Sequence, residues 1–129
     1  MPESSFKSSE ELEAYQKAVL DRYTYEFGDF RFCWVTRMVN WGDAQIKLTE
    51  VEADVLKILI DEWPMPSTTT NIVVKLGDVS YAGPADIKTW IKRLRKKLHS
   101  AVILSKVNSD VSYGYKFNAK GIMSREVTH

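Results

Sequence analysis

Residues 84–98 read Pro-Ala-Asp-Ile-Lys-Thr-Trp-Ile-Lys-Arg-Leu-Arg-Lys-Lys-Leu and predict an amphipathic helix. At 100° per residue, one narrow stripe is apolar and consists of Ile87, Ile91, Leu94 and Leu98. The opposite side is basic and consists of Lys88, Lys92, Arg95 and Lys96, with Thr89 and Arg93 beside them. Pro84 and Asp86 suit the first helical turn, so we expect the helix to begin near Gly83-Pro84. The apolar side is suited to burial, and the basic side to a DNA groove.

Basic helix faces are just as often plain solvated surface, so the distribution of charge along the chain is informative. Residues 84–107 hold seven basic side chains against the single acid Asp86, a net charge of +6. The basic residues are Lys88, Lys92, Arg93, Arg95, Lys96, Lys97 and Lys106. Since the whole chain carries only +1, the remaining residues sum to −5. Positive charge gathered on one element of a nearly neutral chain favours a polyanionic partner.

Length and composition predict one globular domain in the cytoplasm. The 129 residues are enough for a single core, and 44% hydrophobic with 12% aromatic residues indicates that one forms. No apolar run approaches the roughly 20 residues of a membrane span, and the N-terminus lacks a signal-peptide core. Cys33 is the only cysteine, which excludes an intrachain disulfide and indicates a reducing compartment.

Motifs of catalysis are missing from the sequence. The only histidines, His99 and His129, are far apart and show no metal-ligand spacing with Cys33. There is neither a glycine-rich phosphate loop nor a nucleophile motif. We therefore predict a protein that is not an enzyme and has no metal site and no cofactor.

Residues 1–26 predict an N-terminal helical extension. Ser8 and Glu11 match a capping box, and the apolar residues Leu12, Tyr15, Val19 and Tyr23 follow on one face. That face must pack either on the body of the domain or on a second copy of itself. The sequence thus makes residues 8–23 the candidate surface for a homodimer.

Between residues 27 and 66 the pattern changes from strands to a helix. Aromatic and branched residues over 27–48, with a Gly42-Asp43 turn, predict three short antiparallel strands. Thr49 and Glu52 form a second capping box before an apolar helical face. Pro64 and Pro66 end that helix.

The remaining segments are shorter. Residues 67–76 are ambiguous, because their branched residues favour a strand whereas Ser67 suits the cap of a short helix. Gly77–Gly83 is expected to be a loop. Residues 102–117 predict a β-hairpin with its turn at Asn108-Ser109-Asp110. Residues 118–129 show no pattern and are expected to form a loose C-terminal tail.

Three motifs together resemble a known family. They are Leu48-Thr49-x-x-Glu52-x-x-Val55-Leu56, the run Ile91-Lys92-Arg93-Leu94-Arg95-Lys96-Lys97-Leu98, and Gly114-Tyr115-Lys116-Phe117. In this order they resemble the C-terminal effector domain of OmpR/PhoB-type response regulators over residues 27–117. The resemblance implies an α+β winged helix-turn-helix with a small N-terminal antiparallel sheet, a three-helix core and a C-terminal β-hairpin wing, here preceded by an extra N-terminal helix.

The family also implies roles for individual residues. Helix 84–98 would read the major groove, with the base-facing positions at Asp86, Thr89 and Arg93. The phosphate-contacting positions correspond to Ala85, Trp90, Lys92 and Arg95. Loop Gly77–Gly83 corresponds to a segment that touches RNA polymerase, and Lys106–Val111 to the wing that approaches the minor groove.

Several positions depart from the family pattern. Ala85 stands where an arginine is usual, which removes one phosphate contact. Trp90 lies at the edge of the apolar stripe and is expected to belong to the core. Asp110 in the wing would repel phosphate, and Lys75 stands where an apolar residue is expected. Only some 26 residues precede the strands, too few for a phosphoacceptor domain, so control by aspartyl phosphorylation is not expected.

The sequence therefore predicts a stand-alone, phosphorylation-independent, sequence-specific transcriptional regulator that binds double-stranded DNA. The predicted contacts are Asp86, Lys88, Thr89, Lys92, Arg93, Arg95, Lys96 and Lys106. Two alternatives stay open. One is a protein-interaction module on the same scaffold, with RNA polymerase or another regulator as its partner. The other is an architectural protein that binds DNA without sequence preference.

Overall fold

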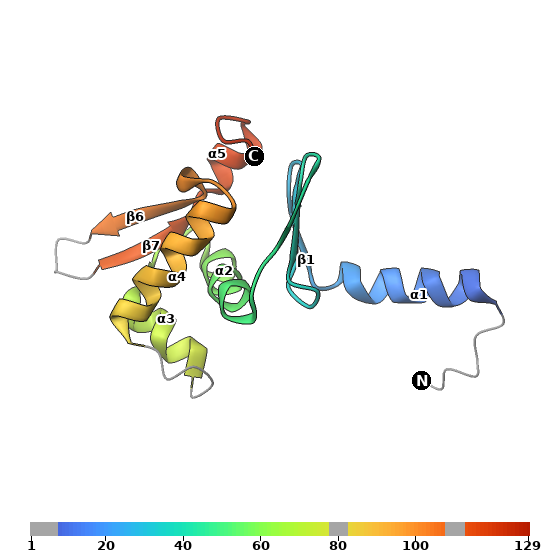
Figure 1. Ribbon diagram of the computed structural model, residues 1–129, viewed down its shortest axis with the longest axis horizontal. Helices are drawn as coiled ribbons and strands as arrows, with labels where there is room; N and C mark the ends of the chain where they lie inside the picture. Colours follow the sequence, from blue (N-terminus) through green and yellow to red (C-terminus); the bar gives the residue numbers. More distant parts are fainter. Residues whose placement is uncertain (1–7, 78–82, 108–112) are drawn as a thin grey trace.

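The chain folds into an elongated body from which one helix projects (Figure 1). The structure is a computed structural model that describes residues 8–77, 83–107 and 113–129. Helix α1 (Ser9–Asp21) is followed by strands β1 (Thr24–Phe27), β2 (Phe30–Cys33), β3 (Met38–Trp41) and β4 (Ala44–Lys47). Next come α2 (Glu50–Glu62), β5 (Ser67–Thr68), α3 (Thr69–Leu76) and α4 (Pro84–Lys97). A 3₁₀ turn (Ser100–Val102), β6 (Ile103–Val107), β7 (Tyr113–Phe117) and α5 (Ala119–Met123) complete the chain.

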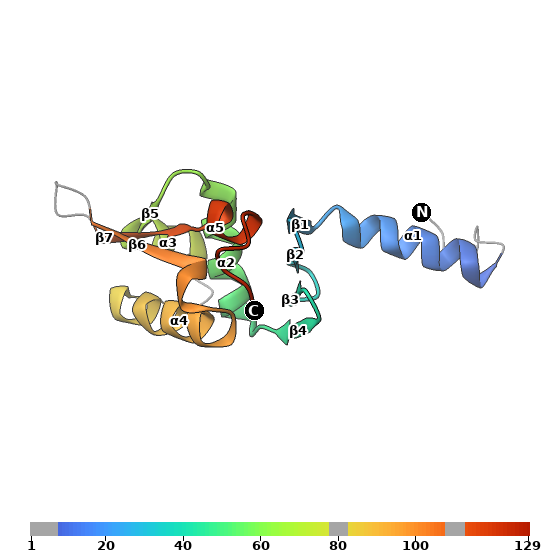
Figure 2. The ribbon, with the colours of Figure 1, turned by 90° about the horizontal axis from the view of Figure 1, so that it is seen from above.

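Helix α1 begins as predicted and makes few contacts with the rest of the described chain. The Ser8 hydroxyl oxygen accepts a hydrogen bond from the Glu11 backbone N–H at 3.1 Å, yet no residue of Ser9–Asp21 is buried. A hollow of about 380 Å³ lies between the last turns of α1 and the outer face of the four-stranded sheet. Both views show the helix pointing away from the other elements (Figures 1 and 2). The two predicted alternatives, packing of α1 on its own domain and packing on a second copy, both stay predictions.

The N-terminal sheet has four strands, not the expected three. They form an antiparallel meander in the order β1-β2-β3-β4. The prediction assigns residues 24–26 to the extension, whereas α1 ends at Asp21 and β1 already starts at Thr24. Gly28 and Gly42, with φ of +63° and +58°, form the tight turns that join β1 to β2 and β3 to β4.

One face of this sheet forms part of the core. Alternate residues of β2 and β3 are buried on that face, namely Phe30, Phe32, Val39 and Trp41. Helix α2 contributes Ala53, Val55, Leu56 and Leu59 to the same core. Its predicted capping box is confirmed: the Glu52 N–H donates to the Thr49 hydroxyl at 3.2 Å, and the Thr49 N–H donates to the Glu52 carboxylate at 2.9 Å.

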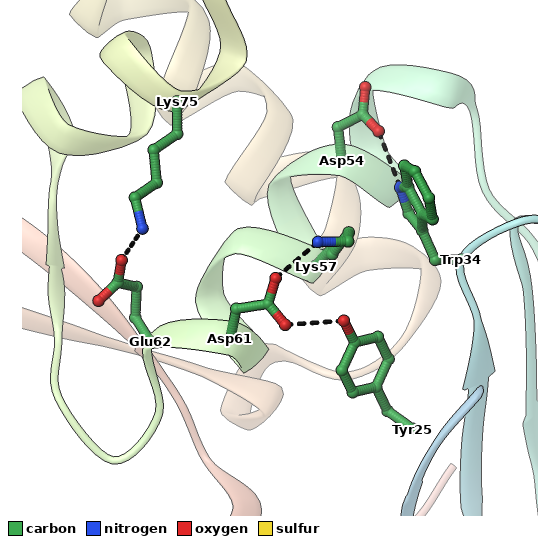
Figure 3. Close-up of polar contacts among 7 residues, drawn as sticks. All are labelled: Tyr25, Trp34, Asp54, Lys57, Asp61, Glu62 and Lys75. Carbon is green, nitrogen blue, oxygen red and sulfur yellow. Dashed lines mark hydrogen bonds and ion pairs between the residues drawn. The ribbon is translucent and has the colours of Figure 1, made fainter. Parts of the chain in front are cut away.

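Polar side chains attach the sheet to the exposed side of α2 (Figure 3). The Tyr25 hydroxyl donates to Asp61 at 2.7 Å, and the Trp34 indole N–H donates to Asp54 at 3.0 Å. Burial, followed by the hydrogen bond to Asp61, raises the pKa of Tyr25, so its phenol keeps the proton that it donates. Lys57 pairs with Asp61 and lies 5.2 Å from the centre of the Trp34 ring. These contacts fix the sheet against the helical half of the molecule.

Residues 67–76 combine both predicted structures. Ser67–Thr68 is a short strand, and Thr69–Leu76 is a helix whose cap is Thr68, not Ser67, with the Asn71 N–H donating to the Thr68 hydroxyl at 3.0 Å. Strand β5 pairs with β7, which pairs with β6, so the predicted hairpin is confirmed as part of a three-stranded sheet. The turn with Asp110 and most of loop Gly77–Gly83 lie outside the described residues.

The C-terminal tail is folded, so the expectation of a loose segment was wrong. Asn118 caps α5, its side-chain oxygen accepting from the Gly121 N–H at 3.1 Å while its amide donates to the Ala101 carbonyl at 2.9 Å. Ile122 and Val127 are 1% and 5% exposed. A helix of five residues is too short for hydrophobic periodicity to indicate.

Candidate nucleic-acid interface

Helix α4 is anchored along its apolar stripe. Ile87, Ile91 and Leu94 are at most 1% exposed and Leu98 is 4% exposed. The helix packs against α2 and α3, and the half-buried Trp90 packs on the edge of the core, where the sequence placed it. At the N-terminal end of α4, the Gly83 N–H donates to the Asp86 carboxylate at 2.8 Å, so the helix begins at Pro84 as predicted.

The opposite side of α4 forms the surface that we call the basic surface. Its exposed α4 residues are Lys88, Thr89, Lys92, Arg93 and Lys96, and Lys106 on β6 is exposed as well. Asp86 and Ala85 are also exposed, at the N-terminal end of the helix. Five of the eight predicted contact residues therefore lie on this surface, with Asp86 at the helix start and Lys106 on strand β6. The Thr89 hydroxyl donates to the Ala85 carbonyl at 3.2 Å, which leaves its methyl group for contact with a ligand.

Arg95 points toward the wing sheet and not along the basic surface. Its guanidinium donates to the Ile103 carbonyl at 2.7 and 3.1 Å and to the Ser105 hydroxyl at 2.8 Å. The group also lies 5.7 Å from the centre of the Tyr115 ring. Arg95 thus joins α4 to β6 and β7. The periodicity of the sequence placed it on the polar side of α4 but contained no signal for this neighbour.

Lys97 is likewise turned inward, toward α2. Its ammonium donates to the carboxylate of Glu52 at 2.5 Å, and the Glu52 side chain is only 2% exposed. Burial would raise the pKa of Glu52, but the hydrogen bonds from Lys97 and Thr49 and the positive charge of Lys97 lower it overall. The Lys97 carbonyl lies 3.1 Å from the His129 ring nitrogen Nε2. Both contacts hold the C-terminal end of α4.

Lys75, unusual for the family, also has a local explanation. It is exposed on α3 and forms an ion pair with Glu62 at the end of α2 (Figure 3). The position therefore links two helices at the surface and does not interrupt the core.

Residues 8–77, 83–107 and 113–129 also bear on metal binding and on membrane insertion. No group of three or more His, Cys, Asp or Glu side chains there is placed to hold a metal ion. Nor does this part of the chain contain a helix of the length and apolarity that crossing a bilayer demands.

The fold has clear relatives among solved structures, although no protein-family profile and no curated protein sequence matches the chain. The DNA-binding domain of Klebsiella pneumoniae RstA, solved with the RstA box, is 26% identical with a TM-score of 0.58, and the match covers 73% of this chain and 95% of that one. Thermotoga maritima DrrB, an OmpR/PhoB homologue, is 25% identical with a TM-score of 0.59. That match covers 84% of this chain but only 51% of DrrB. The DNA-binding domain of Escherichia coli CadC, at 15% identity, has a TM-score of 0.61, with 71% of this chain and 88% of that one covered.

Proposed function

Because the chain folds as an OmpR/PhoB-type winged helix-turn-helix effector domain, we propose that it is a sequence-specific transcriptional regulator that inserts α4 into the major groove of double-stranded DNA. The observation that carries this proposal is the two-sidedness of α4. Its apolar stripe is buried, whereas its outward side presents Lys88, Lys92, Arg93 and Lys96 to solvent. A firmly anchored helix can hold such side chains in register with bases and phosphates.

The exposed side chains suit different parts of a DNA site. Arg93 is the main candidate for reading a base, since a guanidinium binds the O6 and N7 acceptors of guanine in bidentate fashion. Lys88, Lys92, Lys96 and Lys106 are point charges that suit phosphates. Thr89 offers a methyl group to thymine. Asp86 can accept from a cytosine amino group, although its carboxylate already caps α4.

Replacement of Arg93 by alanine tests the base-reading role. We expect Arg93→Ala to cost about 1–3 kcal/mol on the preferred site and much less on random DNA. The preferred site is first obtained by sequencing the duplexes that the protein retains from a random pool. Fluorescence anisotropy with both duplexes then measures the two losses.

A phosphate contact should behave differently. Lys92→Ala should weaken binding to both duplexes equally and reduce the slope of log affinity against log salt by about one unit. Lys120→Ala is the matched control, because it removes an exposed lysine on α5, outside the basic surface. An equal loss on both duplexes for Arg93→Ala would favour an architectural DNA binder. Absence of salt-sensitive binding would contradict the DNA proposal and favour a protein partner, such as RNA polymerase.

The remaining features of the proposal concern assembly and control. One recognition helix reads a short site, so we propose that two copies act together through residues 8–23. The basic surface is already exposed, which supports DNA binding that needs no aspartyl phosphorylation. Because the proposed ligand is double-stranded DNA, we also propose that the protein acts in the cytoplasm.

A further inference from the structure

A hollow of about 240 Å³, which we call the wing hollow, lies beside the sheet formed by β5, β7 and β6. Side chains alternate between the two faces of a sheet. Ser105 and Tyr115 are on the face toward α4, where both meet the guanidinium of Arg95. Leu104 and Lys116, which are register partners and line the hollow, therefore lie on the other face. The wing hollow is thus on the side of this sheet that is turned away from α4.

The wing hollow is mainly apolar and has a firm floor. Phe117 is fully buried and its ring centre lies 4.9 Å from that of Phe27, which in turn lies 6.3 Å from Trp63. A cavity of about 150 Å³ is enough to hold benzene, so this hollow has room for one aromatic or large aliphatic side chain. Five of its eight lining residues are apolar, namely Trp63, Pro64, Leu104, Phe117 and Ala119.

The free polar groups at the wing hollow are positively charged. The three remaining lining residues are Lys116, Asn118 and Lys120. The Asn118 side chain is already occupied, because its oxygen accepts from the Gly121 N–H and its amide donates to the Ala101 carbonyl. Neither lysine forms an ion pair with a carboxylate of the described residues, and none of those carboxylates lines the hollow. An apolar hollow edged by two such ammonium groups complements an apolar side chain flanked by carboxylates.

We propose that the wing hollow is a docking site for an acidic peptide segment of a partner protein. The segment inserts one apolar side chain into the hollow and pairs its carboxylates with Lys116 and Lys120. A DNA backbone fits this site less well, because its phosphates have no apolar group to fill the hollow. Since the wing hollow and the basic surface lie on different sides of the molecule, both can be occupied at once.

Selection from a library of random peptides supplies the probe. The immobilised full chain should retain peptides in which an aromatic or large aliphatic residue is flanked by glutamate or aspartate. Fluorescence anisotropy with one retained peptide then measures its affinity. Replacing its apolar residue with serine should weaken binding by about 10-fold or more, because the hollow is left unfilled. Retention of no peptide, or of peptides without acidic residues, overturns the proposal.

Charge reversal locates the bound peptide. Lys116→Glu and Lys120→Glu should each weaken binding by about 5-fold or more, whereas Lys120→Arg should preserve it. Lys120 is exposed on α5, so its reversal is decisive even where Lys116→Glu, on a strand, fails to fold. Lys96→Glu on the basic surface is the matched control and should leave peptide binding unchanged. Release of the peptide by Lys96→Glu and not by Lys120→Glu would assign it to the basic surface and overturn the proposal.

DNA binding by the same variants separates the two kinds of ligand. Lys120→Glu should bind a duplex as well as the wild type does, whereas Lys96→Glu should bind it less tightly. An equal loss for the two variants would assign the wing hollow to DNA and overturn the docking of a peptide. Peptide binding by a chain that binds no DNA would contradict the proposed function and leave the docking site intact.

Discussion

The buried carboxylate of Glu52 connects α2 to α4 through the ammonium of Lys97. Its pKa is lowered in the folded chain, so between the folded and unfolded values the unfolded chain binds more protons. The ion pair therefore stabilises the fold above the ordinary pKa of 4.5, and this contribution is lost as the pH falls through the folded value.

Glu52→Gln should remove that dependence. At neutral pH we expect a loss of about 2 kcal/mol, below the cost of breaking a fully buried pair because Lys97 is one-third exposed. As the pH falls below 4.5, the difference from wild type should shrink. Urea denaturation across this pH range measures both effects. Glu50→Gln, at an exposed position in the same helical turn, is the control; a similar loss there would show that the pair is unimportant.

Arg95 has two candidate roles, contact with phosphate and attachment of α4 to the wing sheet. Arg95→Lys keeps the charge but cannot reproduce the forked contact with the Ile103 carbonyl. We expect the free energy of unfolding to fall by about 1–2 kcal/mol. Arg95→Ala should then leave the salt dependence of DNA binding unchanged. A slope reduced by about one unit would instead support the phosphate contact predicted from the sequence.

Local signals in the sequence predicted some of the contacts that these residues make and not others. The spacing of Thr49 and Glu52 was enough to place the start of α2, because a capping box involves only residues three apart. The second partner of Glu52 is Lys97, 45 positions away, and depends on how two helices pack. Periodicity gives the side of a helix on which a residue lies, but not the neighbour that it meets.

Helix α5 and the residues after it are expected to be part of the cooperative fold. Ile122→Ala should destabilise the protein by about 2–5 kcal/mol, since its side chain is 1% exposed. Met123→Ala, next to it but 48% exposed, should change stability by no more than about 0.5 kcal/mol. Thermal denaturation followed by circular dichroism compares the two variants, and equal effects would mean that the tail is not packed in solution.

The elements that were predicted well are those in which a periodic pattern extends over many residues or a strong signal marks a boundary. Helices α2 and α4 each span more than three turns, and Pro64 and Pro84 mark one end of each. Strand β5 has two residues and α5 has five. Strand β5 forms because it pairs with β7, and α5 forms because its buried residues pack in the core. At Gly114 an added Cβ would lie 2.6 Å from the Ser67 carbonyl oxygen. The sequence pattern of residues 67–76 gives no sign of this close approach between β5 and β7.

The order of elements and the three motifs that resemble the OmpR/PhoB-type family were sufficient to predict the winged-helix topology, apart from strands β1 and β5 and helix α5. The position of α1 was not predictable, because amphipathicity shows that a face needs cover and not which surface supplies it. Only the structure reveals that the outer face of the neighbouring sheet does not cover this helix.

Deletion of residues 1–22 should therefore leave the body folded. The cut preserves the Tyr23 carbonyl, which accepts a hydrogen bond from the Trp34 N–H at 3.0 Å. We expect a change in stability of less than about 1 kcal/mol and an unchanged affinity of each single body for a single DNA site. Calorimetry and anisotropy measure these quantities. Unfolding of the truncated chain would show that α1 packs on the body after all.

The opposite placement of α1 and α4 also bears on how such a chain can change over time. No described residue belongs to both surfaces, and the sheet and α2 lie between them (Figure 1). A mutation that alters the DNA sequence read by α4 leaves the other end of the molecule untouched, and the reverse holds as well. Lineages carrying this architecture are free to acquire new operators while keeping their assembly partner, or to exchange partners while keeping their operators.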